Sequence, residues 1–180
     1  MVLWAVALVG GVALALNLGA ASGSNPWSGV NKAVCVIQPT QGHSAAGTVT
    51  FTQWGDELKI HADIHGLTAN HKHAIHIHQF GDINCKDGKC AGGHYNPEKH
   101  PHGLPPNENR HAGDLGNLQA DSSGHAVYDL TVDNISVAGM KNPIIGRAII
   151  VHAKADDGGQ PTGNAGGRIG YGVIGIARSK

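Results

Sequence analysis

The sequence predicts an all-β protein, an antiparallel sandwich or barrel with two long loops. Apolar and polar residues alternate in several short runs, which is the pattern of strands with one buried face. Clusters of turn-forming residues separate these runs, and helical spacing is nowhere sustained. Glycine supplies 27 of the 180 residues, whereas Phe, Trp and Tyr together make up 4%. That composition suits many short strands and turns better than a helical bundle.

The chain opens with an apolar, uncharged segment at residues 2–22, which closes in Gly19, Ala20, Ala21 and Ser22. A secretory cleavage site requires such small residues, so we expect a signal peptide at residues 1–22 and a secreted protein, although a basic n-region is missing. A transmembrane anchor is the alternative, but the run to Leu16 is shorter than the about 20 residues that span a bilayer. After signal removal we expect no stable membrane association. Residues 23–31 read as a flexible leader.

The remaining residues, 32–180, form one domain that contains the predicted strands. Residues 58–64 alternate between apolar and polar side chains, and residues 47–53 and 124–132 behave similarly. Turn clusters rich in Gly, Asp and Ser separate these runs, as expected between the strands of an antiparallel sheet.

Two segments lack any periodicity. The first, residues 81–113, contains Pro97, Pro101, Pro105 and Pro106. A structureless loop of this length is uncommon unless it is functional. Four candidate metal ligands lie in it or at its end, and a bound metal would order it: His94, His102, His111 and Asp114. The second segment, residues 156–167, is rich in glycine and separates His152 from Arg168.

Six histidines and one aspartate fall at spacings that build two adjacent metal sites. His76 and His78 are two apart on a predicted strand, so they share one face while Ile75 and Ile77 enter the core. Four imidazoles suit Cu(II), and imidazoles with one carboxylate suit tetrahedral Zn(II). Six histidines suffice for both sites if one imidazole serves two metals. A copper site beside a zinc site points to redox chemistry at the copper, because copper changes its oxidation state and zinc does not.

Five motifs carry a resemblance to a known family. They are H-x-H at 76–78, G-H-x-N-P at 93–97, H-x-G-D-L-G-N at 111–117, V-H-x-K-A-D-D at 151–157 and G-N-A-G-x-R at 163–168. In this order, from about Lys32 to Ala177, they resemble the copper/zinc superoxide dismutase family. The resemblance implies a Greek-key sandwich or barrel with an immunoglobulin-like architecture. It also implies superoxide as the substrate, copper and zinc as cofactors, and a homodimer, to which residues 144–146 and 172–177 could contribute an apolar patch.

The resemblance also implies a role for each candidate residue. Copper is expected on His76, His78, His94 and His152. Zinc is expected on His94, His102, His111 and Asp114, so that His94 is shared and also takes part in catalysis. Asp156 corresponds to a carboxylate that ties a copper ligand to a zinc ligand. Arg168 corresponds to an arginine that guides the anion. His73 corresponds to a histidine that bonds the backbone, and the other histidines are expected to be exposed.

The cysteines depart from the family pattern. Family members join a cysteine of the zinc loop to one on the last strand, but Tyr171 stands at the last-strand position and Gly88 at the loop position. The three cysteines leave three possible pairings. Cys85 with Cys90 is the most local of them, and an exported chain would be oxidised. Cys35 matches a buried first-strand cysteine of the family.

The charge pattern also departs from the family. Lys and Arg number 13 against 13 Asp and Glu, with no basic run, which argues against a nucleic-acid partner. Attraction of an anion must therefore come from local fields. The second segment is short and lacks charged residues in its middle, so we expect an altered field in which Arg168 carries most of the attraction. A non-enzymatic copper-delivery domain or metal buffer is the alternative function, although such domains typically lack part of the copper set or the arginine.

Overall fold

The computed structural model describes residues 27, 29–139 and 141–179. The expected signal peptide, residues 1–22, lies outside them, and so does most of the leader. The described part consists of eight strands and one turn of 3-10 helix, in the order β1 (Lys32–Pro39), β2 (Ala46–Trp54), β3 (Glu57–His65), β4 (Lys72–His78), η1 (Lys89–Ala91), β5 (Asp114–Gln119), β6 (Ala126–Val132), β7 (Ala148–His152) and β8 (Arg168–Ile176). None of the described residues belongs to a helix long and apolar enough to cross a membrane. The predicted all-β class is confirmed.

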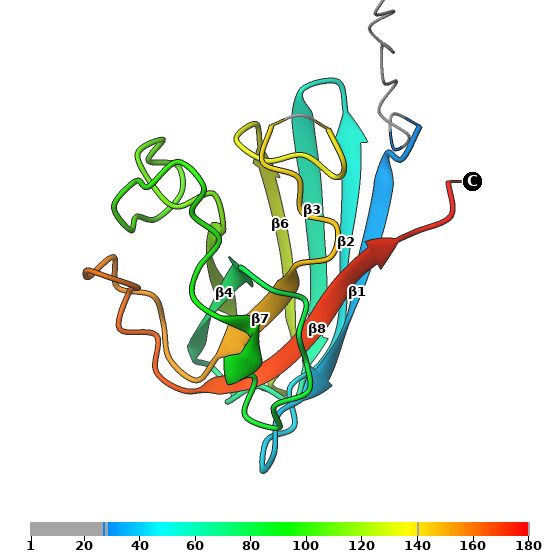
Figure 1. The fold of residues 1–180 in the computed structure, drawn as a ribbon. Coiled ribbons are helices and arrows are strands. Elements are labelled where there is room, and N and C mark those ends of the chain that lie inside the picture. The colour runs from blue at the N-terminus through cyan, green and yellow to red at the C-terminus, as the bar shows by residue number, and fades with distance from the viewer. Residues whose placement is uncertain (1–26, 28, 140, 180) are drawn as a thin grey trace, which may run out of the picture.

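The strands form a nearly closed antiparallel barrel (Figure 1). Their order around it is β5-β4-β7-β8-β1-β2-β3-β6, with β5 and β6 facing each other across the remaining gap. The strands β1, β2 and β3 follow one another as hairpins, whereas the β3–β4 and β6–β7 connections cross between the halves of the barrel. This exchange gives the Greek-key order.

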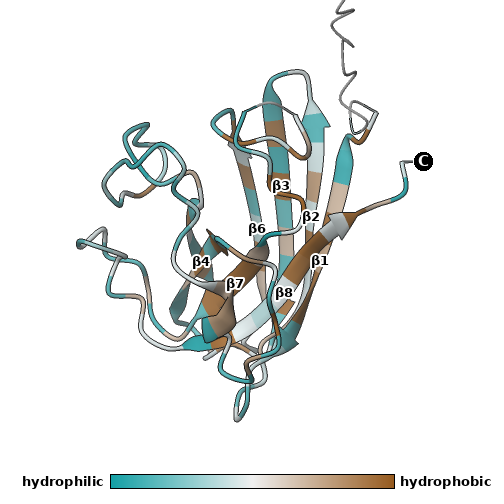
Figure 2. Cartoon of the chain, in the orientation of Figure 1, coloured by the Kyte–Doolittle hydropathy of each residue, from teal (hydrophilic) through white to brown (hydrophobic). Residues whose placement is uncertain are grey.

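The predicted half-buried strands form where the alternation is regular. In β3 every second side chain is buried, and these side chains are Leu58, Ile60, Ala62 and Ile64. Figure 2 shows the same alternation as brown and teal bands along the strand. The strand predicted over 124–132 begins only at Ala126, because the Asp121 carboxylate accepts hydrogen bonds from the N–H groups of Ser123 and His125 and holds the preceding residues in a turn.

Two strands show no alternation because both of their faces are covered. All five residues of β7 are buried, as are all residues of β4 after Lys72. Ile75 and Ile77 enter the main core, as predicted, while His76 and His78 point the other way. The two long loops cover that second face, the first running from β4 to β5 and the second from β7 to β8 (Figure 1).

Candidate metal centre

A ring of three backbone hydrogen bonds fixes the first loop on β4. The N–H of Ile77 donates to the carbonyl of Gly113, that of Gly113 to Tyr95, and that of Tyr95 to Ile77, each at 2.9 Å. Gly113 must be a glycine, because a Cβ there would lie 2.2 Å from the Ile77 carbonyl oxygen. Every member of the ring adjoins a candidate ligand in the sequence, so the ring sets the positions of His76, His78, His94 and Asp114.

The predicted ligands come together in two groups. The first is His76, His78, His94 and His152, and the second is His94, His102, His111 and Asp114. Within each group the ligand atoms lie within 4.8 Å of one another, and all seven side chains are buried. The strand β4 supplies His76 and His78, β7 ends at His152, and β5 begins at Asp114. The first loop supplies the other three histidines, as predicted from its place between β4 and β5.

In the first group each imidazole is held by one nitrogen and leaves the other free. His76 Nε2 donates to Asp156 Oδ2 at 2.8 Å, and His78 Nδ1 donates to the Gly92 carbonyl at 2.9 Å. His152 Nδ1 lies 3.4 Å from the Gly166 carbonyl oxygen. The second nitrogens, His76 Nδ1, His78 Nε2 and His152 Nε2, are buried and have no hydrogen-bond partner. Buried polar atoms are rarely left unpaired. These nitrogens therefore fit a bound metal ion.

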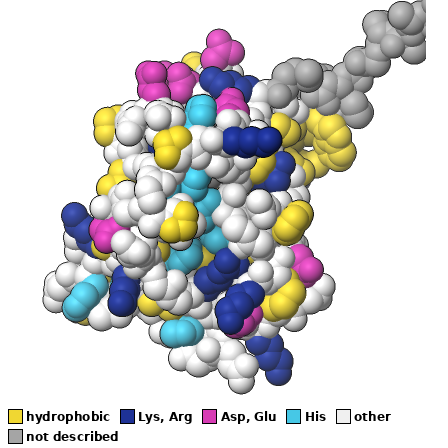
Figure 3. Space-filling view, turned by 60° about the vertical axis from the view of Figure 1, so that its left-hand side comes forward, with side chains coloured by type: hydrophobic (Ala, Val, Ile, Leu, Met, Phe, Trp, Pro, Cys, Tyr) yellow, Lys and Arg dark blue, Asp and Glu magenta, His cyan; other side chains and the backbone are white. Residues whose placement is uncertain are grey.

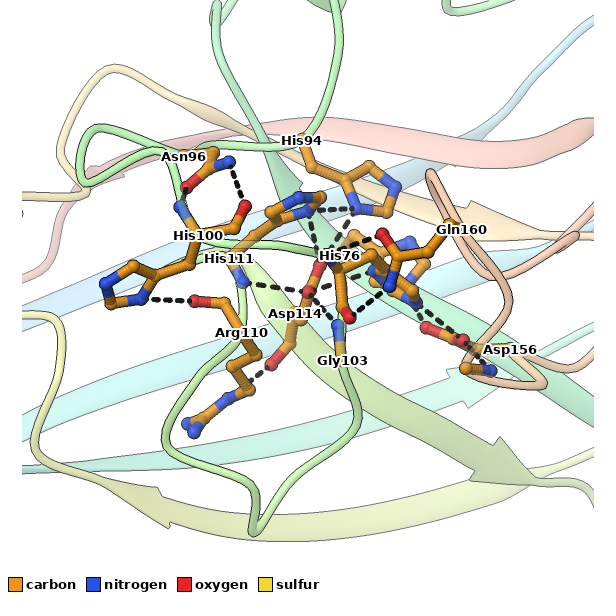
Figure 4. Close-up of polar contacts among 12 residues, drawn as sticks. His76, His94, Asn96, His100, Gly103, Arg110, His111, Asp114, Asp156 and Gln160 are labelled. Atoms are coloured by element: carbon orange, nitrogen blue, oxygen red, sulfur yellow. Dashed lines mark hydrogen bonds and ion pairs between the residues drawn. The ribbon is translucent and has the colours of Figure 1, made fainter.

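In the second group three nitrogens crowd around one carboxylate (Figure 4). Asp114 Oδ1 lies 2.9 Å from His94 Nδ1 and 3.2 Å from His111 Nδ1, and Asp114 Oδ2 lies 3.0 Å from His102 Nδ1. The last contact lacks hydrogen-bond geometry, so the buried His102 Nδ1 is also unpaired. Three imidazoles and one carboxylate are a donor set suited to tetrahedral zinc.

His94 belongs to both groups. Its Nδ1 faces Asp114 and His111, and this leaves Nε2 for the first group. The centroids of the His94 and His76 rings are 4.0 Å apart. One imidazole can therefore bridge two ions through its two nitrogens.

Asp156 connects the two groups a second time. Besides accepting from His76, it accepts a hydrogen bond from His102 Nε2 at 2.9 Å through its other oxygen. The Asn117 amide brackets the Asp156 backbone, donating to its carbonyl at 2.9 Å and accepting from its N–H at 2.7 Å. Burial would raise the pKa of Asp156, but the hydrogen bonds from His76 and His102 outweigh it and hold the pKa well below its usual value. Asp156 is therefore an anion that orients one ligand of each group.

Burial keeps three imidazoles of the first group neutral, those of His76, His78 and His152. It lowers the pKa of His76 to about 4, against a weaker opposing effect from the Asp156 hydrogen bond. It lowers the pKa of His152 to about 3, and it lowers the pKa of His78 as well. Neutral imidazole is the form that binds metal, so near neutral pH no proton has to be displaced from these side chains.

The first group opens onto a pocket of about 450 Å³. Its lining includes His78, His94, His152, Lys154, Asn164 and Arg168. Figure 3 shows histidine side chains gathered in the middle of this face, beside Lys and Arg side chains. Arg168 is half-buried, and its two terminal nitrogens donate to the carbonyls of Gly88 and Gly92, both at 2.6 Å.

Lys154 is a pocket residue that the sequence reasoning missed. It is exposed and adds a second positive charge to the pocket lined by Arg168. The motif V-H-x-K contains it two residues after His152, where the chain bends away from the end of β7.

Cys85 and Cys90 form a disulfide inside the first loop, while Cys35 is a buried free thiol. Burial raises the pKa of Cys35 to about 12, so the thiol stays protonated. Tyr171 packs against a small buried cluster of Ala91, Ala148 and Ile150. The loop segment that follows the disulfide is thus held on the barrel by packing.

The remaining histidines lie outside both groups. His73 is buried, with Nδ1 donating to the His152 carbonyl at 2.8 Å and Nε2 accepting from the Thr68 N–H at 3.2 Å. His100 bonds the Arg110 carbonyl through Nδ1 at 3.2 Å. The others are exposed or half-exposed: His43, His61, His65, His71 and His125.

The family model described as copper/zinc superoxide dismutase (SODC) matches residues 45–174 of this chain. The matched residues include all seven ligands of the two groups, Asp156 and Arg168.

We predict that the metal-free protein loses stability as the pH falls from about 6.5 towards 4. The folded pKa values of His76 and His152, about 4 and about 3, lie below the unfolded value of 6.5. In that range the unfolded chain binds more protons than the folded one. The free energy of unfolding therefore decreases as the pH is lowered. Denaturant midpoints at about pH 7 and about pH 4.5 measure the change. His152→Gln removes one such imidazole and should reduce the slope, whereas a constant wild-type midpoint would contradict the prediction.

Proposed function

Since the chain belongs to the copper/zinc superoxide dismutase family, we propose that it is a superoxide dismutase. The reaction converts two superoxide anions and two protons to one molecule of oxygen and one of hydrogen peroxide. One observation carries the proposal: two buried ligand groups share His94, and the first opens onto a pocket lined by Arg168.

We assign copper to His76, His78, His94 and His152, and zinc to His94, His102, His111 and Asp114. The unpaired buried nitrogens and the donor types support this assignment. When bound, copper supplies the one-electron chemistry, accepting an electron from one superoxide as Cu(II) and giving one to the next as Cu(I). Zinc does not change its oxidation state, so its part is to order the first loop and hold His94.

Arg168 and Lys154 attract and orient the anion. Burial lowers the pKa of Arg168, but a guanidinium stays charged at every physiological pH. The bonds to Gly88 and Gly92 hold the guanidinium in place on the pocket wall. Its planar fork can hold a diatomic anion beside the nitrogens of the first group. Lys154 lies at the exposed rim, where its charge acts over a longer range.

His94 is placed to supply a proton to the reduced product. Its Nδ1 is held by Asp114, and its Nε2 faces the first group, whose pocket the substrate enters. A proton could reside at Nε2 only while that nitrogen is not bound to copper, and it could then pass to an oxygen atom in the pocket. The return of protons from solvent is direct because the pocket is open.

We also propose that the protein acts outside the cell. The uncharged apolar segment 2–22 and the small residues that close it support export. The disulfide within the first loop is the form expected in an oxidising compartment.

We further propose a homodimer, whose contact surface keeps the β8 segment expected from sequence, within residues 172–177, and leaves out Ile144. Ile144 is buried in the core and contributes nothing to an outer surface. Ile176 at the end of β8 is 49% exposed, and Phe80 in the first loop is 57% exposed. Gly81 packs closely on Val173 of β8, so this loop segment and the strand lie side by side. Phe80 and the adjoining part of β8 around Val173 offer an apolar surface for a second copy of the chain.

The primary test combines metal content with dismutation. We expect the protein loaded with one copper and one zinc per chain to dismute superoxide catalytically. His78→Ala should abolish activity and leave a folded barrel, because it removes one copper ligand at the end of β4. Circular dichroism and metal analysis accompany the assay. A loaded wild-type protein that binds both metals without catalysis would identify a copper-delivery or buffering domain.

Removing the arginine should slow the reaction. We predict that Arg168→Ala lowers the second-order rate constant roughly tenfold, about 1.4 kcal/mol, and flattens its decline with salt. Arg168→Lys should recover part of the rate, since the charge is kept and the planar fork is lost. Lys154→Gln should reduce the salt dependence with a smaller loss of rate. Superoxide decay after pulsed generation, followed across a salt series, measures all four proteins. A wild-type rate and salt slope in Arg168→Ala would remove Arg168 from the mechanism.

The dimer is tested by sedimentation of the mature chain at micromolar concentration. We expect a dimer in the wild type and dissociation in Phe80→Asp, because a charge would be buried in the apolar contact. Val127→Asp is the matched control, since Val127 is 55% exposed on the outer face of β6. A monomeric wild type would reject the dimer.

A further inference from the structure

The second loop makes a contact with the zinc ligand set that the family motifs do not contain. Gln160, near its middle, bonds His102 in the first loop. Figure 4 shows Gln160 beside the cluster that contains Asp114 and Gly103. Its Oε1 accepts from the His102 N–H at 3.1 Å, and its Nε2 donates to the His102 carbonyl at 2.8 Å. The side-chain amide thus bonds both backbone groups of one ligand, as a neighbouring strand would.

The backbone of the same loop also lies against the His102 side chain. Gly163 has a φ of +78°, and a Cβ built there would lie 2.1 Å from Asp156 Oδ1 and 2.8 Å from His102 Nε2. The loop therefore covers the hydrogen bond between Asp156 and His102, and only a glycine allows so close an approach. Two separate residues of the second loop, Gln160 and Gly163, converge on this one ligand.

The backbone of His102 itself is held by this contact, while the next residue is anchored separately, since the Gly103 N–H donates to Asp114 Oδ2 at 3.0 Å. His94 and Asp114 adjoin the backbone ring of Ile77, Tyr95 and Gly113. The N–H of His111 donates to Asp114 Oδ2 at 3.0 Å. Within the described part of the chain, the only hydrogen bonds of the His102 N–H and carbonyl are those to Gln160.

We infer that Gln160 is a positioning residue for His102, and that the short second loop, which has no charged residue between Asp157 and Arg168, retains zinc. This rests on the proposed assignment of zinc to the second group. By fixing the backbone of His102, the amide holds Nδ1 toward Asp114 and the other imidazoles. Residues that orient a ligand typically contribute 10- to 100-fold to metal affinity. The loop that retains zinc also lines the copper pocket through Thr162 and Asn164, so loss of the Gln160 contact loosens a wall of that pocket.

The test compares zinc release from Gln160→Met and wild-type protein. Methionine keeps the length of the side chain and removes both hydrogen bonds. We expect the loaded variant to transfer zinc to a chromogenic chelator about tenfold faster, with copper release much less affected. Asp114→Ala, which removes a ligand outright, sets the upper limit. Cobalt in the zinc position provides a second readout, because its visible absorption bands report the geometry of the ligands.

Gln53 offers a matched control for general destabilisation. Its amide also brackets backbone, donating to the carbonyls of Gly55 and Glu57 at 3.0 and 3.1 Å and accepting from the Val137 N–H at 3.0 Å. Gln53 belongs to β2 and contacts none of the ligands. Gln53→Met should lower the melting temperature and leave zinc release at the wild-type rate. Equal acceleration in both Met variants would show a global effect and overturn the inference.

Hydrogen exchange in the metal-free protein gives a readout that needs no metal. The His102 amide should exchange faster in Gln160→Met than in wild type, while the Tyr95 and Gly113 amides of the backbone ring stay protected. Unchanged exchange at His102 together with unchanged zinc release would overturn the role of Gln160 and leave the zinc assignment intact. A wild-type protein that takes up no zinc on the second group would instead overturn the zinc assignment of the proposed function.

Discussion

The ring of backbone hydrogen bonds among Ile77, Tyr95 and Gly113 is the constraint on which the rest of the site depends. It joins a strand, the middle of a long loop and the start of another strand at one point. Regular sheet pairing could not place the loop there, because the loop has no strand of its own beside β4. Once the ring is closed, His94 must lie over His76, and Asp114 must face the histidines of the loop. The metal centre therefore requires a glycine at position 113 as well as the ligands, because a Cβ there would prevent the ring from closing.

The two ligand groups contain unpaired buried nitrogens and buried carboxylates, which bound metal ions would satisfy. Four buried nitrogens have no hydrogen-bond partner in the described structure, and burial keeps the imidazoles of His76, His78 and His152 neutral. Asp114 and Asp156 bring two carboxylates into the same region, each bonded by several donors. Two divalent ions would supply the missing partners and offset the buried negative charge. The main core cluster lies on the other face of β4, and it also includes Tyr95 and Ala112, which adjoin His94 and His111 in the sequence.

Much of this could be predicted from sequence, because local patterns encode it. The alternation in residues 58–64 predicted β3, and the family resemblance carried by the five motifs implied both ligand groups. The patterns failed where a partner is distant in the chain. The strand β7 shows no alternation because loops cover its second face, and Ile144 was taken for a surface residue although it enters the core. The Gln160 contact joins residues 58 positions apart through one amide, which leaves no periodic trace.

The place of the disulfide bears on how the chain matures. Cys85 and Cys90 are five positions apart, whereas Gly88 and Tyr171, where the family has its cysteines, are 171 − 88 = 83 apart. On the chain-entropy model the short cross-link stabilises by about 2 kcal/mol, against about 4.5 kcal/mol for the long one. In exchange, its two thiols meet by local diffusion, and a segment of about ten residues closes in about 10–100 ns. Oxidation therefore does not have to wait for barrel assembly, and the two steps can occur in either order during biosynthesis.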